Sequence, residues 1–299
     1  MHKLEISFFL VLLLLNLFCL QNNLKAETLF MDRAWGNEKL NPITTGMQAS
    51  WLLLFSIFFL FVKKGVSLYL KVLSIPAIGI AVFNILISSS KSSFLFIGIC
   101  VLIMIGLRKS SKGTLKAIAF FVVVTTIILS TFSNSGEYLA LASSRLEYFG
   151  NDLSAVERVD SYGGAYKQFI ESPLIGDFLE EKQTKQYPHN LILEAFMALG
   201  IFGGVLFIII LVVFTYNSIK FISAFPRSPI PYVVLSAITI AMTSGGLSIS
   251  YDFWQQLAMC TGLMWNQKNY LKSTRAIKSP PGDASPGAEP TNKLIVPQT

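Results

Sequence analysis

The sequence predicts an all-α, polytopic membrane protein with about eight transmembrane helices and one large extracytoplasmic loop that contains short amphipathic helices. Of its 299 residues, 53% are hydrophobic and only 14% are charged, and the mean hydropathy is +0.57. Soluble domains average about 45–50% apolar and about 25% charged residues. The apolar residues also gather into runs close to the roughly 20 residues that cross a bilayer. An ordinary soluble domain is therefore excluded.

Eight apolar stretches are the expected spans. Each should be a helix because lipid leaves no partner for free backbone polar groups, and no segment shows the alternation of a β-barrel strand. The first resembles a signal peptide or anchor, but no small-residue cleavage site follows before Lys25, so we expect an uncleaved span. The eight stretches cover about 5–20, 48–62, 67–88, 93–107, 115–133, 190–216, 230–248 and 251–267.

The basic residues predict the orientation of these spans. Four Lys/Arg clusters fall on the same side of the alternating spans, which the positive-inside rule makes cytoplasmic, together with both termini. The net charge of +7 then divides into +12 inside and −5 outside. It predicts attraction to anionic membrane lipid and requires no nucleic acid. The clusters are Lys63–Lys64, Arg108–Lys116, Lys220 with Arg227, and Lys268–Lys278.

The spans divide the chain into five segments. The last is rich in Pro, Gly and polar residues, and we expect it to be a disordered cytoplasmic tail. The three cysteines lie in apolar runs without a disulfide or metal-binding spacing. The segments are 1–49 (first span and outer loop), 50–133 (spans two to five), 134–189 (extracytoplasmic loop with the expected site), 190–267 (spans six to eight) and 268–299 (tail).

The loop 134–189 is the largest polar stretch and contains an amphipathic helix pattern. Ser154 and Glu157 have the spacing of a capping box. Apolar residues follow at helical spacing, which predicts a helix that can lie on the membrane surface, weakened in the middle by Gly163–Gly164 and ended by Ser172–Pro173. The apolar residues are Val159, Tyr162, Tyr166, Phe169 and Ile170.

The order of motifs around this helix resembles the O-antigen ligase and polymerase family. Its pattern is an arginine, a short amphipathic helix, a (Ser)-Pro-hydrophobic-x-Gly turn, then His-Asn at a helix start and Gly-Ile-x-Gly. Ser90–Ser93 is also similar to that family's Ser-Arg-small motif, with Lys91 in place of the usual arginine. The resemblance covers about residues 80–265 and rests on Arg158, Ser172–Gly176, Pro188–Asn190, Glu194 and Gly200–Gly204.

Members of that family are integral membrane transferases. The resemblance implies transfer of a glycan from undecaprenyl diphosphate to lipid A core, another glycan or a protein, on the outer face of the inner membrane. It also implies no metal or other cofactor, basic residues on the diphosphate and a histidine at the acceptor. By motif, His189 and Arg158 are the expected catalytic residues, and Lys91, Arg145, Asn190 and Glu194 the expected substrate-binding residues.

The chemistry of these residue types agrees with those roles. Arginine binds phosphate with a bidentate fork, whereas lysine offers a point charge. The chain has two histidines, and the cytoplasmic placement of His2 leaves His189 as the imidazole on the outer face. A helix N-terminus disfavours imidazolium, so His189 is suited to accept a proton.

Two other functions stay open from the sequence. A transporter of lipid-linked glycan or a small solute is one, although such proteins usually show internal repeats and charges at mid-bilayer, and here the charges sit at span ends and in the outer loop. An inactive subunit of a polysaccharide assembly complex is the other: family members usually have ten to twelve spans, whereas about eight are expected here, so the chain is a candidate for an N-terminally shortened member.

Overall fold

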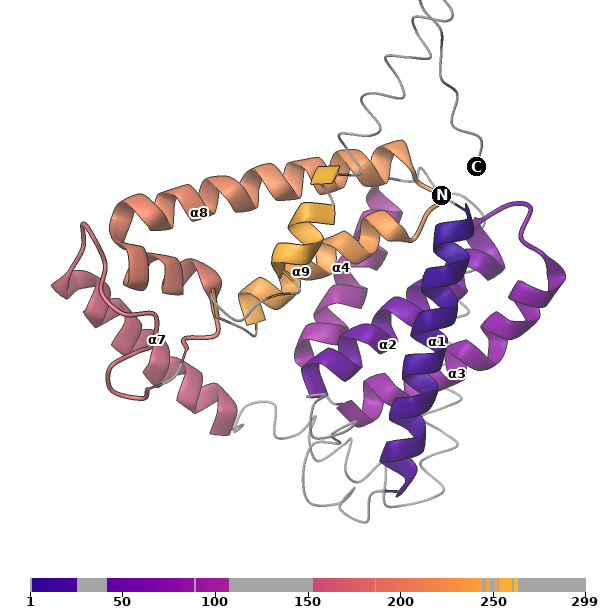
Figure 1. The fold of residues 1–299 in the computed structure, drawn as a ribbon, viewed down its shortest axis with the longest axis horizontal. Helices are drawn as coiled ribbons and strands as arrows, with labels where there is room; N and C mark the ends of the chain where they lie inside the picture. Colours follow the sequence, from indigo (N-terminus) through magenta and orange to yellow (C-terminus); the bar gives the residue numbers. More distant parts are fainter. Residues whose placement is uncertain are drawn as a thin grey trace, which may run out of the picture. The chain divides into compact units, whose positions relative to one another are not determined.

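The computed structural model describes residues 2–25, 42–88, 90–107, 153–185 and 187–243, with parts of 246–262. Every element in these ranges is helical. The chain forms two compact units, Met1–Cys260 and Thr261–Thr299, and the first holds all the named elements. They are α1 (His2–Lys25), α2 (Pro42–Ile57), the π-helical η1 (Phe58–Val62), α3 (Leu68–Ser88), α4 (Lys91–Leu107), α7 (Leu153–Glu171), α8 (Leu191–Ala224) and α9 (Ile230–Thr243) (Figure 1).

Helix α2 and η1 form the centre of the N-terminal helices. The apolar stretch Ile43–Val62 is 72% buried, against 33% for the stretch in α1. Helix α2 packs against α1, α3 and α4, and η1 continues it by one wide turn in which the Lys63 N–H donates to Phe58 O at 2.8 Å. The Phe58 ring lies 5.3 Å from the ring of Tyr232, which links η1 to α9.

Helix α1 is held in this group by polar as well as apolar contacts. The Asn84 amide donates to the backbone and side-chain oxygens of Asn16, both at 3.0 Å and fully buried. Lys63 forms an ion pair with Glu5 at the other end of α1. Such interhelical polar contacts contribute about 0.6 kcal/mol each in membranes. These contacts support the prediction that the first span is not cleaved.

The membrane-spanning pattern is confirmed in part. Four helical stretches are long and apolar enough to cross a bilayer, and two shorter apolar helices, Ser92–Met104 and Ile230–Thr239, accompany them. The predicted fifth span (115–133) lies outside the described residues, and the predicted total of eight is not confirmed. The four stretches are Lys3–Asn22, Ile43–Val62, Leu68–Ser88 and Leu191–Ala224.

The amphipathic helix predicted within residues 134–189 is present as α7. Gly163–Gly164, expected to weaken it, does not interrupt it. Val159, Tyr166 and Ile170 are exposed, whereas Phe169 packs edge-on against Phe196 of α8 at 5.5 Å. Helix α7 therefore packs on α8 and leaves an apolar stripe uncovered.

Candidate functional site

The His189–Asn190 pair forms the turn that starts α8. The Asn190 side chain caps the helix, because its Oδ1 accepts from the N–H groups of Ile192 at 3.1 Å and Leu193 at 3.2 Å. His189 has a φ of +53°, in the left-handed region that residues other than glycine seldom adopt. Glu194 lies in the first turn and is fully buried.

Helix α8 is broken at Gly200, where φ is +66° and ψ is −166°. We call residues 191–199 the first arm, residues 201–224 the second arm, and Gly200 the corner; Figure 1 shows the short arm and the long arm meeting in a sharp bend. The second arm alone is about 36 Å long at 1.5 Å per residue, enough to cross a hydrocarbon core of about 30 Å. The sequence prediction of one uninterrupted span over 190–216 thus missed this break.

The segment after α7 satisfies the backbone groups that the break sets free. We call residues 172–185 the strap. In an unbroken helix the Ile201 N–H would donate to Met197 O. Here the Ile201 N–H donates to Pro173 O at 2.8 Å, and Met197 O accepts from the Asp177 N–H at 3.0 Å. The strap therefore replaces one lost helical hydrogen bond with two that cross between the segments.

Two glycines allow this close approach of backbones. A Cβ atom on Gly176 would overlap the backbone of Ala198 and Leu199, and one on Gly200 would overlap Leu174. Both glycines have positive φ, +79° and +66°, which side chains disfavour. The Ser-Pro-hydrophobic-x-Gly and Gly-Ile-x-Gly patterns, 24 positions apart at Gly176 and Gly200, are therefore the two sides of one contact.

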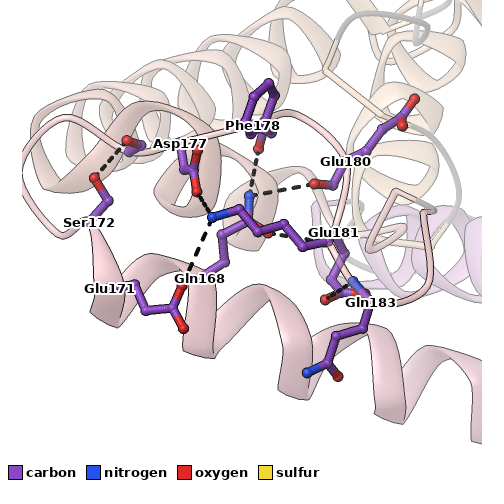
Figure 2. Close-up of polar contacts among 10 residues, drawn as sticks. Gln168, Glu171, Ser172, Asp177, Phe178, Glu180, Glu181 and Gln183 are labelled. Carbon is purple, nitrogen blue, oxygen red and sulfur yellow. Dashed lines mark hydrogen bonds and ion pairs between the residues drawn. The ribbon is translucent and has the colours of Figure 1, made fainter.

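A second set of contacts ties the strap to α7 (Figure 2). The Gln168 amide donates to Phe178 O at 3.2 Å and Glu180 O at 3.4 Å, and its Oε1 accepts from the Lys182 N–H at 3.2 Å. The Lys182 ammonium pairs with Asp177. The Gln168 side chain is only 2% exposed, which places it between α7 and the strap. It therefore binds the strap backbone from the face of α7 that the strap covers.

Glu181 anchors the middle of the strap. Its carboxylate accepts from the N–H groups of Gln183 at 2.8 Å and Thr184 at 2.5 Å. Burial acts to raise the pKa of Glu181, but these hydrogen bonds and the charge of Lys185 outweigh it and lower the pKa below the usual 4.5. The carboxylate is thus ionised at neutral pH, and its contribution to strap stability is lost only as the pH falls through that lowered pKa.

A cluster of buried serines surrounds the start of α4, where the predicted Lys91 is the first helical residue. Ser90 and Ser92 share a hydrogen bond of 2.7 Å. A Cβ atom on Gly46 of α2 would lie 2.5 Å from the hydroxyls of both Ser88 and Ser93. This packing of α2 on the turn between α3 and α4 was not predicted, because nothing around Gly46 in the sequence marks a contact more than 40 residues away.

The structure places five of the six predicted site residues. His189, Asn190 and Glu194 come together at the start of the first arm, Lys91 begins α4, and Arg158 is half-buried on α7. Arg145 lies outside the described residues. Among the described residues, no three His, Cys, Asp or Glu side chains gather as metal ligands. The metal-independent chemistry expected from the sequence remains a prediction.

The region that carries these motifs matches one known protein family. Residues 76–208 match the family model for O-antigen ligase. Residues 76–208, which we call the ligase region, are therefore similar to the O-antigen ligase family. The ligase region contains all six predicted site residues, the strap and the corner of α8. No curated protein and no solved structure matches the chain. The ligase match and the apolar helices together indicate a multi-pass membrane protein.

The corner of the ligase region gives the first testable prediction. Gly200→Ala should lower the free energy of unfolding by about 1–3 kcal/mol or more, because φ +66° with ψ −166° is a conformation essentially restricted to glycine and the added Cβ also overlaps Leu174. Gly79→Ala in α3 is the control, since nothing lies within 4 Å of its added Cβ. Denaturant titration in detergent measures both, and equal midpoints for the two variants would contradict the close contact.

The strap gives a second prediction from two adjacent glycines on α7. A Cβ on Gly164 would overlap the Glu181 side chain, whereas one on Gly163 meets nothing within 4 Å. Gly164→Ala should therefore detach the strap and speed its proteolysis, and Gly163→Ala should leave it unchanged, because alanine favours the helix at both positions. Limited proteolysis followed by mass spectrometry locates the cuts. Similar cutting in both variants would argue against the Gly164–Glu181 contact.

Proposed function

We propose that the protein is a membrane glycan transferase of the O-antigen ligase/polymerase type. It moves a glycan from undecaprenyl diphosphate to an acceptor hydroxyl on the extracytoplasmic face of the inner membrane. The acceptor is a glycan, a lipid or a protein. The observation that carries this proposal is the family match, which spans every motif from Lys91 to Gly204, together with the strap-and-corner contact that joins two of those motifs.

The proposed reaction needs an acid–base group and a cationic site. His189 accepts the proton of the acceptor hydroxyl. At the same time the hydroxyl oxygen forms a bond to the anomeric carbon, and the bond from that carbon to the diphosphate breaks. Displacement in this direction inverts the anomeric carbon. The backbone supports the role of His189, since the residue precedes the capped N-terminus of α8, where the helix dipole favours neutral imidazole.

Arg158, Lys91 and Arg145 supply positive charge for the leaving diphosphate in this proposal. Arg158 and Arg145 each carry a guanidinium that can bind a phosphate with two hydrogen bonds, whereas Lys91 offers a point charge. Lys91 starts α4, so the helix N-terminus adds favourable potential for an anion at the same place. Asn190 and Glu194 lie at the same end of α8. The Asn190 Oδ1 accepts from the Ile192 N–H in the first turn, and the Glu194 Oε1 accepts from the Leu247 N–H outside it.

Reconstituted protein with undecaprenyl-diphosphate-linked glycan and an acceptor tests this proposal. His189→Ala should reduce transfer by roughly 10²- to 10⁴-fold, the range for a positioned acid–base group. Arg158→Ala should reduce it by roughly 10²- to 10³-fold, as for the loss of one electrostatic stabiliser. The matched controls are His2→Ala, which removes the other histidine, and Lys167→Ala, which removes an exposed cation from the same helix as Arg158.

The controls should keep wild-type transfer with unchanged folding. Glycan that crosses the vesicle membrane without being joined to an acceptor would contradict the proposal and indicate a transporter. Full transfer by both His189→Ala and Arg158→Ala would contradict the assigned residues.

A further inference from the structure

The backbone of Leu247, in the segment that follows α9, forms hydrogen bonds through both its N–H and its carbonyl. Its N–H donates to Glu194 Oε1 at 2.8 Å, and its carbonyl accepts from the Trp254 indole N–H at 2.9 Å. The Trp254 ring in turn lies 6.4 Å from the ring of Phe207 in the second arm of α8. This path therefore connects the first arm of α8 to the second arm through Leu247.

The same segment touches the chain on both sides of His189. A Cβ atom on Gly246 would lie 2.7 Å from Cδ1 of Tyr187 and 3.2 Å from Oε1 of Glu194. Tyr187 is two positions before His189, and Glu194 is five positions after it. The intervening backbone includes the left-handed φ of His189, a conformation that persists only where its surroundings hold it.

Glu194 is the polar link in this arrangement. Its side chain is 0% exposed, and among the described residues its second oxygen, Oε2, has no hydrogen-bond partner. Burying a carboxyl group is unfavourable unless its oxygens accept hydrogen bonds. An apolar side chain would fill the space between the first arm and Gly246 without that cost, so the hydrogen bond to Leu247 is the feature that distinguishes a glutamate here.

We propose that Glu194 is a positioning residue: it fixes residues 246–247 against residues 187–194 and so sets the orientation of His189. The importance of this orientation for transfer rests on the proposed function, but the contact itself does not. The proposal requires an acceptor at position 194 and requires no negative charge there. Glutamine can therefore replace glutamate, because its side-chain oxygen accepts from the same N–H.

The two-histidine composition makes His189 directly observable. In a His2→Asn background, ¹³C-histidine labelling leaves one imidazole signal in the full-length protein, which we call the parent resonance. NMR in lipid nanodiscs then reports the surroundings of His189 whether or not any substrate is known. Thermal unfolding of each variant is measured beside it, so that general instability is seen separately.

We expect Glu194→Gln to keep the parent resonance and Glu194→Ala to lose it to a shifted or multiple signal. Trp254→Phe, which keeps an aromatic ring but removes the N–H donor, should shift the signal in the same direction. This variant tests the proposal even where Glu194→Ala does not fold. Ser236→Ala is the control for instability, because it removes a buried hydroxyl 3.0 Å from Gln256 Oε1, in a contact between α9 and the helical residues 253–259. This contact involves neither Tyr187 nor Leu247.

An unchanged parent resonance in both Glu194→Ala and Trp254→Phe would overturn the proposal. So would its loss in Glu194→Gln, which would show that charge rather than the acceptor matters, or its loss in Ser236→Ala, which would show that any destabilisation moves His189. If the resonances follow the prediction while wild-type protein transfers no glycan, the proposed function fails and the positioning contact stands. In an active preparation, misplacing His189 should reduce kcat on the order of 10²-fold, as for a 1 Å displacement, with little change in KM.

Discussion

The break in α8 at Gly200 is the constraint on which the rest of the ligase region depends. A helix interrupted in an apolar setting leaves backbone groups that lipid cannot satisfy, so another part of the protein must bind them. The strap supplies both partners, through Pro173 O and the Asp177 N–H. Once the strap must reach this point, the other contacts follow: Gly176 has to be small, and Gln168 and Glu181 have to bind the backbone of the strap where it returns along α7.

The break also explains how a turn with His189 is combined with a membrane span. An uninterrupted α8 would extend from the first arm straight into the second, with only its own helix to orient the start. With the bend, the first arm contacts both the strap and residues 246–247. Elements from α7, α8 and the segment after α9 therefore fix the same short helix. This agrees with the general observation that reactive groups are held most accurately by rigid surroundings.

The sequence predicted the local features and missed the distant contacts. Helix α7 followed from the spacing of Val159, Tyr166 and Ile170, and the start of α8 after His189–Asn190 agrees with the helix start that the family resemblance implied there. The corner did not, because Gly200 in an apolar run looks like a packing residue, and only its contact with Leu174 reveals its conformation. The bond from Glu194 to Leu247 spans 53 residues, and no periodicity encodes such a pair. Arg145 lies outside the described residues and stays a prediction.

The central claim is that the strap and the broken helix satisfy each other's backbone groups. Amide hydrogen exchange at Asp177 and Ile201 measures those two bonds directly. In wild-type protein both amides should exchange slowly, and in Gly176→Ala both should become fast together, because the added Cβ overlaps Ala198 and separates the two segments. Fast exchange of either amide in the wild type, or slow exchange of both in Gly176→Ala, would contradict the account.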